Sequence, residues 1–196
     1  MEHALKFYID GRWVEPCGTT RLPVVNPATE QPFSQIAMGN QADVDAAVLA
    51  AKKAFPAFSN TSPAERKELL RAVLENYLQR YDDIADVITQ EVGATRELSH
   101  QWQTGIGKRH LQQLISTLDT FAFQKARGKT LINLEPVGVV ALITPWNWPI
   151  NQIVCKVAPA LAAGCTMVLK PSEIAPLNAI IFAEVLHNAG VPAGVF

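Results

Sequence analysis

One carboxamide stands among bulky side chains at the end of the apolar run Val137–Ile143. In the segment ITPWNWPINQ, Ile143 to Gln152, two tryptophans and two prolines surround Asn147. The side-chain NH2 of an asparagine can donate a hydrogen bond to a carbonyl oxygen that gains negative charge under nucleophilic attack. Asn147 is equally suited to cap the helix that Pro149 opens, so its residue type leaves both roles open.

A second polar group follows the next apolar run, Thr166–Leu169. Lys170 and Glu173 come directly after it. Dinucleotide-binding folds place an acidic side chain near the end of the second strand, where it accepts hydrogen bonds from ribose hydroxyls. A carboxylate also repels a 2′-phosphate, which favours NAD over NADP, although Lys170 offsets part of that repulsion. A surface ion pair within a turn would explain the same two residues.

The sequence lacks a glycine-rich phosphate loop. No G-x-G-x-x-G follows either apolar run, and the first turn is filled by Trp146, Trp148 and prolines. A backbone without glycine cannot approach a pyrophosphate closely there. If a dinucleotide binds, another part of the protein must hold its pyrophosphate.

No side chain in this sequence is a credible nucleophile. Cys165 precedes the second run at the amino end of its strand, Cys155 falls inside a predicted helix, and Cys17 lies in a loop. The histidines show no pairing with a serine or a cysteine. The cysteines also lack metal-ligand spacing, so we expect no metal site.

The bulk composition argues against several classes of partner. The 196 residues carry a formal net charge of −1, which is unfavourable for binding nucleic acid or an acidic membrane surface. No apolar run reaches the roughly 18 residues of a membrane span, and the first residues do not form a secretory signal. Because cysteines are few, a cytoplasmic location is the simplest expectation.

The first two thirds of the chain predict short strands followed by helices. The expected elements are a hairpin over Phe7–Trp13 that turns at Asp10-Gly11, strands at Val24–Val25 and Phe33–Ile36, and helices from Asp43, from Pro63, over Asp82–Val92 and over Glu97–Phe123. Ser62 and Glu65 form a capping box at the start of the second helix. Gly105 and Gly107 weaken the middle of the fourth.

After Gly128 the pattern becomes that of a parallel α/β sheet. Val137–Ile143 is continuously apolar, as expected for a strand buried on both faces. The expected elements that follow are a helix from Pro149 to Gly164, the strand Thr166–Leu169, a helix from Pro176 to Gly190, and the approach to a third strand at Val191–Phe196. This order predicts an α/β fold with a Rossmann-like βαβαβ unit, whose two polar turns meet at one edge of the sheet.

Several segments together resemble the aldehyde dehydrogenase family. They are FYIDGRWVEP, VVNPATEQ, EVGA, EPVGVVALITPWNWPINQIVCKVAPALAAGCTMVLKPSEIAPL and AGVPAGVF. PWNWP and LKPSE at this spacing are the most specific of them. The resemblance is to the N-terminal portion of the family, so the fold that it implies is an incomplete aldehyde dehydrogenase fold.

The resemblance implies oxidation of an aldehyde to a carboxylate with NAD(P)+. In the family a cysteine thiolate forms a thiohemiacetal, hydride passes to the nicotinamide, and a glutamate activates the water that hydrolyses the thioester. By position, Asn147 matches the oxyanion asparagine. The residues that match the cofactor site, with NAD expected and NADP as the alternative, are Ile143, Thr144, Pro145, Trp146, Lys170, Ser172 and Glu173.

The resemblance also implies a division of the chain. Residues 1–128 hold the N-terminal strands and helices of the cofactor-binding domain, residues 129–136 are a strand segment that resembles the oligomerisation region, and residues 137–196 begin the Rossmann-like sheet. The catalytic domain, with its cysteine and glutamate, lies outside this chain. We therefore expect a fragment that is inactive alone, and a full-length homo-oligomer, dimer or tetramer, that acts on a small aldehyde.

Two other functions stay open at this stage. The chain could be a catalytically inactive nucleotide-binding or structural fragment. It could also belong to a relative that makes acyl-CoA or reduces an acyl phosphate, although PWNWP with KPSE favours the hydrolytic enzymes.

Overall fold

The computed structural model describes every residue from Met1 to Phe196. Its elements in chain order are β1 (Phe7–Ile9), β2 (Arg12–Val14), β3 (Arg21–Asn26), β4 (Gln31–Ala37), α1 (Gln41–Ser59), α2 (Pro63–Gln79), α3 (Tyr81–Val92), the π-helix η1 (Leu98–Thr104), α4 (Gly105–Thr117), β5 (Gln124–Arg127), β6 (Thr130–Asn133), β7 (Val139–Ile143), α5 (Pro149–Ala163), β8 (Thr166–Lys170) and α6 (Leu177–Asn188).

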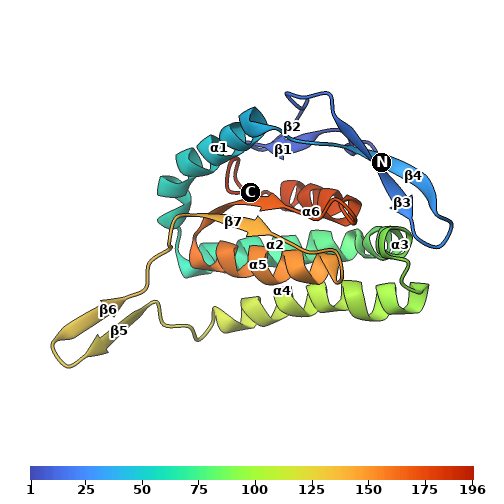
Figure 1. The fold of residues 1–196 in the computed structure, drawn as a ribbon. Helices are drawn as coiled ribbons and strands as arrows, with labels where there is room; N and C mark the ends of the chain where they lie inside the picture. Colours follow the sequence, from blue (N-terminus) through green and yellow to red (C-terminus); the bar gives the residue numbers. More distant parts are fainter.

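A parallel strand pair carries the two polar turns. β7 and β8 pair in parallel, in a register that sets Ile143 opposite Lys170, and α5 forms the crossover between them. Figure 1 shows these strands between α1 on one side and α5 on the other, with α2 and α4 beyond α5. The α/β fold class predicted from the sequence is confirmed.

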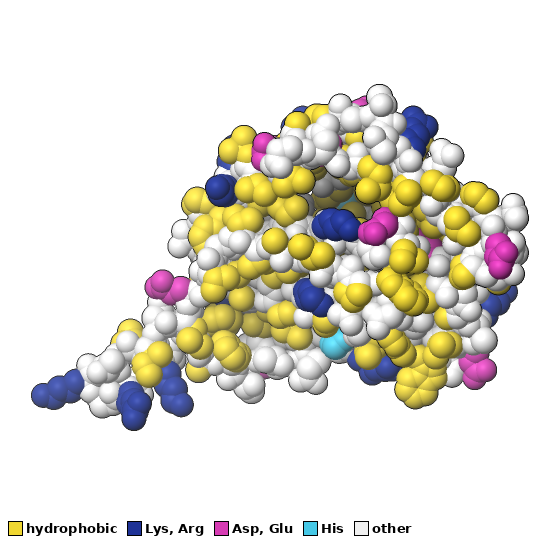
Figure 2. All heavy atoms as spheres, viewed as in Figure 1, with side chains coloured by type: hydrophobic (Ala, Val, Ile, Leu, Met, Phe, Trp, Pro, Cys, Tyr) yellow, Lys and Arg dark blue, Asp and Glu magenta, His cyan; other side chains and the backbone are white.

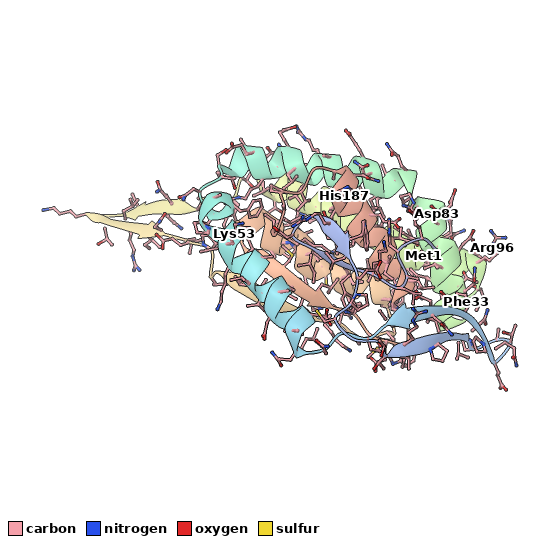
Figure 3. The ribbon with its side chains drawn as sticks, turned by 90° about the horizontal axis from the view of Figure 1, so that it is seen from above. Met1, Phe33, Lys53, Asp83, Arg96 and His187 are labelled. Carbon is pink, nitrogen blue, oxygen red and sulfur yellow. The ribbon has the colours of Figure 1, made fainter.

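The N-terminal hairpin turns where the sequence predicts. Asp10 and Gly11 both have positive φ, at 52° and 72°, as a two-residue turn that matches the strand twist requires. The hairpin packs against the C-terminal end of α6, where Tyr8 Oη and His187 Nδ1 are 3.1 Å apart. Figure 3 shows His187 beside these first strands.

Local capping signals start and stop several helices. Ser62 and Glu65 form the predicted capping box at the start of α2, and Asn40 and Asp43 form another at the start of α1. α3 ends at Gly93, which has a φ of 72°, a conformation that costs glycine little. These boundaries follow from sequence because each depends on neighbours in the chain.

The core lies where the helices cover one another. α6 packs on α2, α3 and α5, and α4 packs on α2 and α5. Tyr77 of α2 and Phe182 of α6 are both fully buried, with their ring centroids 6.2 Å apart. No helix of the chain is both long and apolar enough to cross a membrane.

The helical segment predicted over Glu97–Phe123 is shorter and less regular than expected. Its first part, Leu98–Thr104, is a π-helix, and the α-helix proper is α4, which ends at Thr117. The glycines that weaken the pattern stand at and just after the change from one helix type to the other. Helical periodicity does not signal such a change, because the buried face continues through it.

A hairpin that the sequence analysis did not predict as a pair projects from the body. β5 and β6 pair in antiparallel register from Gln124–Asn133 to Arg127–Thr130, and every residue of both strands is exposed. Figure 1 shows this hairpin standing away from all other elements, and Figure 2 shows basic side chains gathered on it. Without a buried face, β5 lacks the alternation that would predict a strand.

One expectation for the parallel sheet was wrong. Val137–Ile143 is not buried on both faces: Val137 is 85% exposed and Ile143 is 73% exposed, because the sheet has only two strands. Val191–Phe196, the expected approach to a third strand, is a turn that lies against β8. Its one ladder-like contact is the Met167 amide, which donates to the Val195 carbonyl at 2.9 Å.

Candidate functional site

The two polar turns lie side by side at the carboxyl edge of the sheet. The amide of Thr144, the first residue after β7, donates to the carbonyl oxygen of Lys170 at 3.2 Å. Thr144 itself is buried. The β7–α5 turn and the β8–α6 turn are therefore joined at their first residues, as predicted for parallel neighbours.

The structure rules out a capping role for Asn147. The residue that caps α5 is Trp148, with φ −141° and ψ 66°, and no side chain makes a capping hydrogen bond there. The Asn147 side chain is exposed and makes no capping hydrogen bond to α5. The helix-cap interpretation was wrong, and the amide is available to a ligand.

Packing and hydrogen bonds anchor the start of α5, directly after Asn147. Pro149 and Ile150, the first residues of α5, are buried, and the Gln152 amide donates to the Trp148 carbonyl at 2.9 Å. Nε2 of His110, on α4, lies 2.7 Å from Oδ1 of Asn151. The start of α5 is thus fixed to the helical layer, which keeps the adjoining turn in one position.

Lys170 and Glu173 form an ion pair in the second turn. Their Nζ and Oε2 atoms are 2.9 Å apart, and the side chains are 60% and 47% exposed. The hydrogen bond from Lys170 is the main reason that the pKa of Glu173 lies below its usual value. Oγ of Ser172 accepts from the Ile174 amide at 3.3 Å and so shapes the turn. An exposed pair of this kind contributes little to stability and can exchange partners with a ligand.

Sequence reasoning missed one buried carboxylate behind this turn. Glu91, at the end of α3, is 1% exposed and accepts hydrogen bonds from the amides of Leu177 and Asn178 and from the Asn178 side chain. Burial raises its pKa to about 7, against the opposing effect of these hydrogen bonds. A signal was present, because Glu91 lies seven residues after Ile84 on the buried stripe of α3.

None of the three cysteines lies at the joined turns. Cys165 is buried, Cys155 is half-buried, and Cys17 is exposed. Asp43 lies beside Cys17 and raises the pKa of its thiol, chiefly through a side-chain hydrogen bond, which disfavours the thiolate needed for nucleophilic attack. No three side chains of His, Cys, Asp or Glu are grouped to hold a metal ion.

A large apolar hollow opens along the other edge of β8. It has a volume of about 460 Å³, is lined by Tyr8, Trp13, Phe196 and the strand residues Met167 to Leu169, and has Lys170 and Glu173 at its margin. Figure 2 shows a hollow on this face with basic and acidic side chains next to its mouth. Asn147 does not line it, whereas Lys170, Pro171 and Glu173 of the second turn do.

Residues 13–196 match the sequence model of the aldehyde dehydrogenase family. The chain is 49% identical over 192 residues to 3-succinoylsemialdehyde-pyridine dehydrogenase from a Pseudomonas species, a match that covers 97% of this chain and 40% of that protein. The chain therefore spans about 40% of the length of the curated relative that it matches.

Solved structures agree with this match. A cysteine-to-alanine variant of aldehyde dehydrogenase C from Pseudomonas syringae, in complex with NAD+ and octanal, superposes with a TM-score of 0.98 at 47% identity, over 100% of this chain and 40% of that one. A betaine aldehyde dehydrogenase from Staphylococcus aureus, in complex with NAD+, superposes with a TM-score of 0.90 at 31% identity, over 98% and 40%. The family match, these superpositions and the joined turns lead to one conclusion: the chain belongs to the aldehyde dehydrogenase family, of which it matches the N-terminal portion.

Proposed function

We propose that this chain supplies the oxyanion donor and the ribose end of the cofactor site to an enzyme that oxidises an aldehyde to a carboxylate with NAD(P)+. The observation that carries the proposal is the exposed, unpaired amide of Asn147 beside the Lys170–Glu173 turn. The aldehyde dehydrogenase match supports it. The nucleophilic cysteine and the general base of such an enzyme are not among these residues.

Asn147 acts through its side-chain NH2. A thiolate that attacks an aldehyde carbon drives negative charge onto the carbonyl oxygen, and a fixed N–H donor at that oxygen stabilises the charge as it develops. The amide is exposed and does not cap α5, so no capping bond has to break first. The anchored start of α5 fixes the backbone next to Asn147, so the amide group can reach the oxygen by a change of side-chain rotamer alone.

The residues present fit the ribose of a dinucleotide and not its pyrophosphate. Glu173 offers carboxylate oxygens to ribose hydroxyls and Lys170 offers an ammonium group. Ile143, Thr144, Pro145 and Trp146 would line the bound cofactor at the end of β7, with Ser172 in the second turn. No glycine allows the backbone near a pyrophosphate. When bound, NAD(P)+ accepts hydride from the aldehyde carbon, and NAD+ is favoured because Glu173 repels a 2′-phosphate.

We also propose the assembly and the location of the whole protein. Residues 1–128 and 137–196 belong to the cofactor-binding domain, and residues 129–136 join copies into a dimer or tetramer. Leu131, Ile132 and Leu134 are exposed, on or next to a hairpin that touches no other helix or strand of the chain. Exposed apolar side chains of this kind support pairing with a second copy. Few cysteines and the absence of disulfides support a cytoplasmic location.

Replacing Asn147 tests the proposed role. In the whole protein, the Asn147→Ala variant should lower kcat by about 10²- to 10³-fold, measured with a panel of aldehydes and NAD+ or NADP+ through the absorbance of the reduced nicotinamide. Its melting temperature should match that of the wild type, because the side chain makes no hydrogen bond. The exposed Asn188, at the far end of α6, gives a matched Asn→Ala control that should keep full activity.

The same assays separate the competing functions. Turnover that requires coenzyme A or phosphate would indicate an acylating or acyl-phosphate relative. Nucleotide binding without any turnover would indicate an inactive subunit. If the whole protein reduces neither nicotinamide with any aldehyde, the proposed function is wrong.

A further inference from the structure

Helix α6 begins without a cap of its own. The residue before it is Pro176, and no side chain of the local segment makes a capping hydrogen bond. The first amides of a helix have no partner within it, and burying them unpaired is costly. Because Leu177 and Asn178 are buried, water cannot satisfy these amides, and another part of the chain must.

Glu91 provides this cap from the end of another helix. Its side chain reaches from α3 across 86 residues of sequence to the Leu177 amide, which donates to Oε1. Oε2 accepts from the Asn178 amide at 3.3 Å. Both carboxylate oxygens are therefore engaged by backbone N–H donors of the first turn of α6.

Asn178 extends the connection back into the turn. Its Nδ2 donates to Oε2 of Glu91 at 2.9 Å and to the carbonyl oxygen of Ala175 at 2.8 Å. Its side chain is fully buried. The amide thus ties the last residues before α6 to the same carboxylate that caps the helix, and the β8–α6 turn cannot shift without breaking these bonds.

The two ends of that turn are fixed by different partners. At its start, Lys170 lies in register with Ile143, and its carbonyl accepts from the Thr144 amide. At its end, the helix is held by Glu91. Ser172 and Glu173 lie between these two fixed points and are themselves exposed or half-buried. The position of their side chains therefore depends on both anchors. The first anchor is a bond between backbone atoms, so only the second, the Glu91 side chain, can be removed by substitution.

We propose that Glu91, acting through Asn178, is a positioning residue that fixes the β8–α6 turn and thereby sets Lys170 and Glu173 for the ribose of the cofactor. This role rests on the proposed function of that turn. A carboxylate that only stabilised the fold would be a costly choice, since burying an ionisable group is unfavourable. A local serine or aspartate at the position of Pro176 would cap the helix at lower cost.

The test compares three variants of the whole protein. Glu91→Ala removes both acceptors, Glu91→Gln keeps one, and Gln90→Ala is a control at the exposed neighbouring position on α3. The readouts are the Kd for NAD+ and for AMP by calorimetry, kcat and KM for NAD+, and amide hydrogen exchange over residues 171–178.

We expect Glu91→Ala to raise the Kd and KM for NAD+ about tenfold, the size of effect that loss of a helix cap produces. The Kd for AMP should rise in parallel, because AMP carries the same ribose. At saturating NAD+, kcat should stay within about twofold of the wild type, since Asn147 lies on the other turn. Exchange over residues 171–178 should accelerate, Glu91→Gln should give intermediate values, and Gln90→Ala should change nothing.

The outcomes separate this role from simple stabilisation. If the Glu91 variants melt at lower temperature but bind NAD+ and AMP like the wild type, Glu91 is a structural cap and the proposal is overturned. If the wild-type protein binds neither NAD+ nor AMP, the proposed function fails and this role fails with it. Should Glu91→Ala not fold, Glu91→Gln and Asn178→Ala decide the question by the same criteria.

Discussion

Asn147 owes its position to its neighbours and has no hydrogen bond of its own. The buried Pro149 and Ile150 anchor the start of α5 beside it, while the Asn147 side chain is exposed and does not cap that helix. A structural asparagine would show the opposite arrangement, with its amide bonded and its surroundings free to vary. At the scale of the residue, this combination is consistent with the proposed role of Asn147 as a hydrogen-bond donor to a ligand.

Glu173 should govern the choice between the two nicotinamide cofactors. In the whole protein, Glu173→Gln removes the charge that opposes a 2′-phosphate and leaves Lys170 unpaired to attract it. We expect the ratio of kcat/KM for NADP+ to that for NAD+ to rise about fivefold, the effect of about 1 kcal/mol for one exposed charge. Glu97→Gln, at an exposed position far from the turn, is the control. A ratio that stays constant or moves toward NAD+ would remove Glu173 from the ribose site.

Glu91 should make the stability of the protein depend on pH. Its pKa in the folded state, about 7, exceeds the ordinary value of 4.5, so the folded protein retains this proton where the unfolded chain has lost it. The contribution is therefore fully present below about pH 4.5 and is lost as the pH rises through 7. It amounts to about 3 kcal/mol at most.

Denaturation of the whole protein between pH 5 and pH 8 measures this effect. The free energy of unfolding of the wild type should fall with rising pH relative to that of Glu91→Gln, which cannot titrate. The exposed Glu75→Gln variant should follow the wild type. Parallel curves for wild type and Glu91→Gln would show that Glu91 does not titrate in this range.

The sequence indicates where Lys170 and Glu173 lie in the fold but not the buried partner behind their turn, for a physical reason. Lys170 and Glu173 follow a strand directly, so their placement depends only on the strand and its parallel neighbour. Glu91 has partners 86 residues away. No local pattern identifies such a partner, although a carboxylate on a buried helical stripe indicates that one exists.

At the scale of the element, predictions succeeded where the cause is local. The turn at Asp10-Gly11 and the capping box of Ser62 and Glu65 involve residues at most three apart, and both are confirmed. Prediction failed for β5, whose residues are all exposed, and for η1, whose extra backbone spacing leaves the buried face intact. In both cases the pattern of buried residues carries no signal: β5 has no buried face, and η1 shares the buried face of α4.

Gly107 should tolerate no side chain. A Cβ at Gly107 would collide with Oη of Tyr77 and come within 3.0 Å of its Cζ. Tyr77 cannot move away, because it is fully buried and its hydroxyl donates to the Thr104 carbonyl at 2.8 Å. We expect Gly107→Ala to destabilise the whole protein by about 1–3 kcal/mol, more than the gain of up to about 1 kcal/mol in helix propensity.

Gly105 provides the matched control on the same helix. A Cβ there would lie 3.3 Å from Tyr81 Oη and 3.4 Å from Arg109 Nη1, two groups at the ends of partly exposed side chains that can yield. Gly105→Ala should therefore leave the urea midpoint unchanged or raise it slightly. Equal midpoints for the two variants would show that Tyr77 has room to move.

At the scale of the whole molecule, the parallel sheet is the least covered part. The apolar run at β7 that predicts a buried strand is exposed in the 196-residue chain, and β8 has a cavity along its other edge. The order of predicted strands and helices after Gly128 correctly indicated that β7 and β8 are parallel neighbours. How deeply a strand is buried depends on which strands and helices lie next to it, and the apolar run of the strand itself does not specify them.

The isolated 196-residue chain should associate with itself. Val137 and Ile143 expose apolar side chains beside an unpaired strand edge, and Leu131 adds another on the projecting hairpin. Such surfaces pair with other chains. Size-exclusion chromatography with light scattering should find species larger than 21.4 kDa or aggregates at micromolar concentration, and no NAD+-dependent aldehyde oxidation. A monomer with a single cooperative melting transition would contradict this.

The docking of the first hairpin onto the last residues has a consequence for biosynthesis. Tyr8 contacts His187, and a Cβ at Gly11 would lie 2.9 Å from Cβ of Ala193. At about 5–20 residues per second, a ribosome needs about 10–40 s to reach Ala193 after Gly11 has been made. The first hairpin is therefore synthesised well before the C-terminal residues on which it packs. The helices between them have time to fold before the hairpin docks.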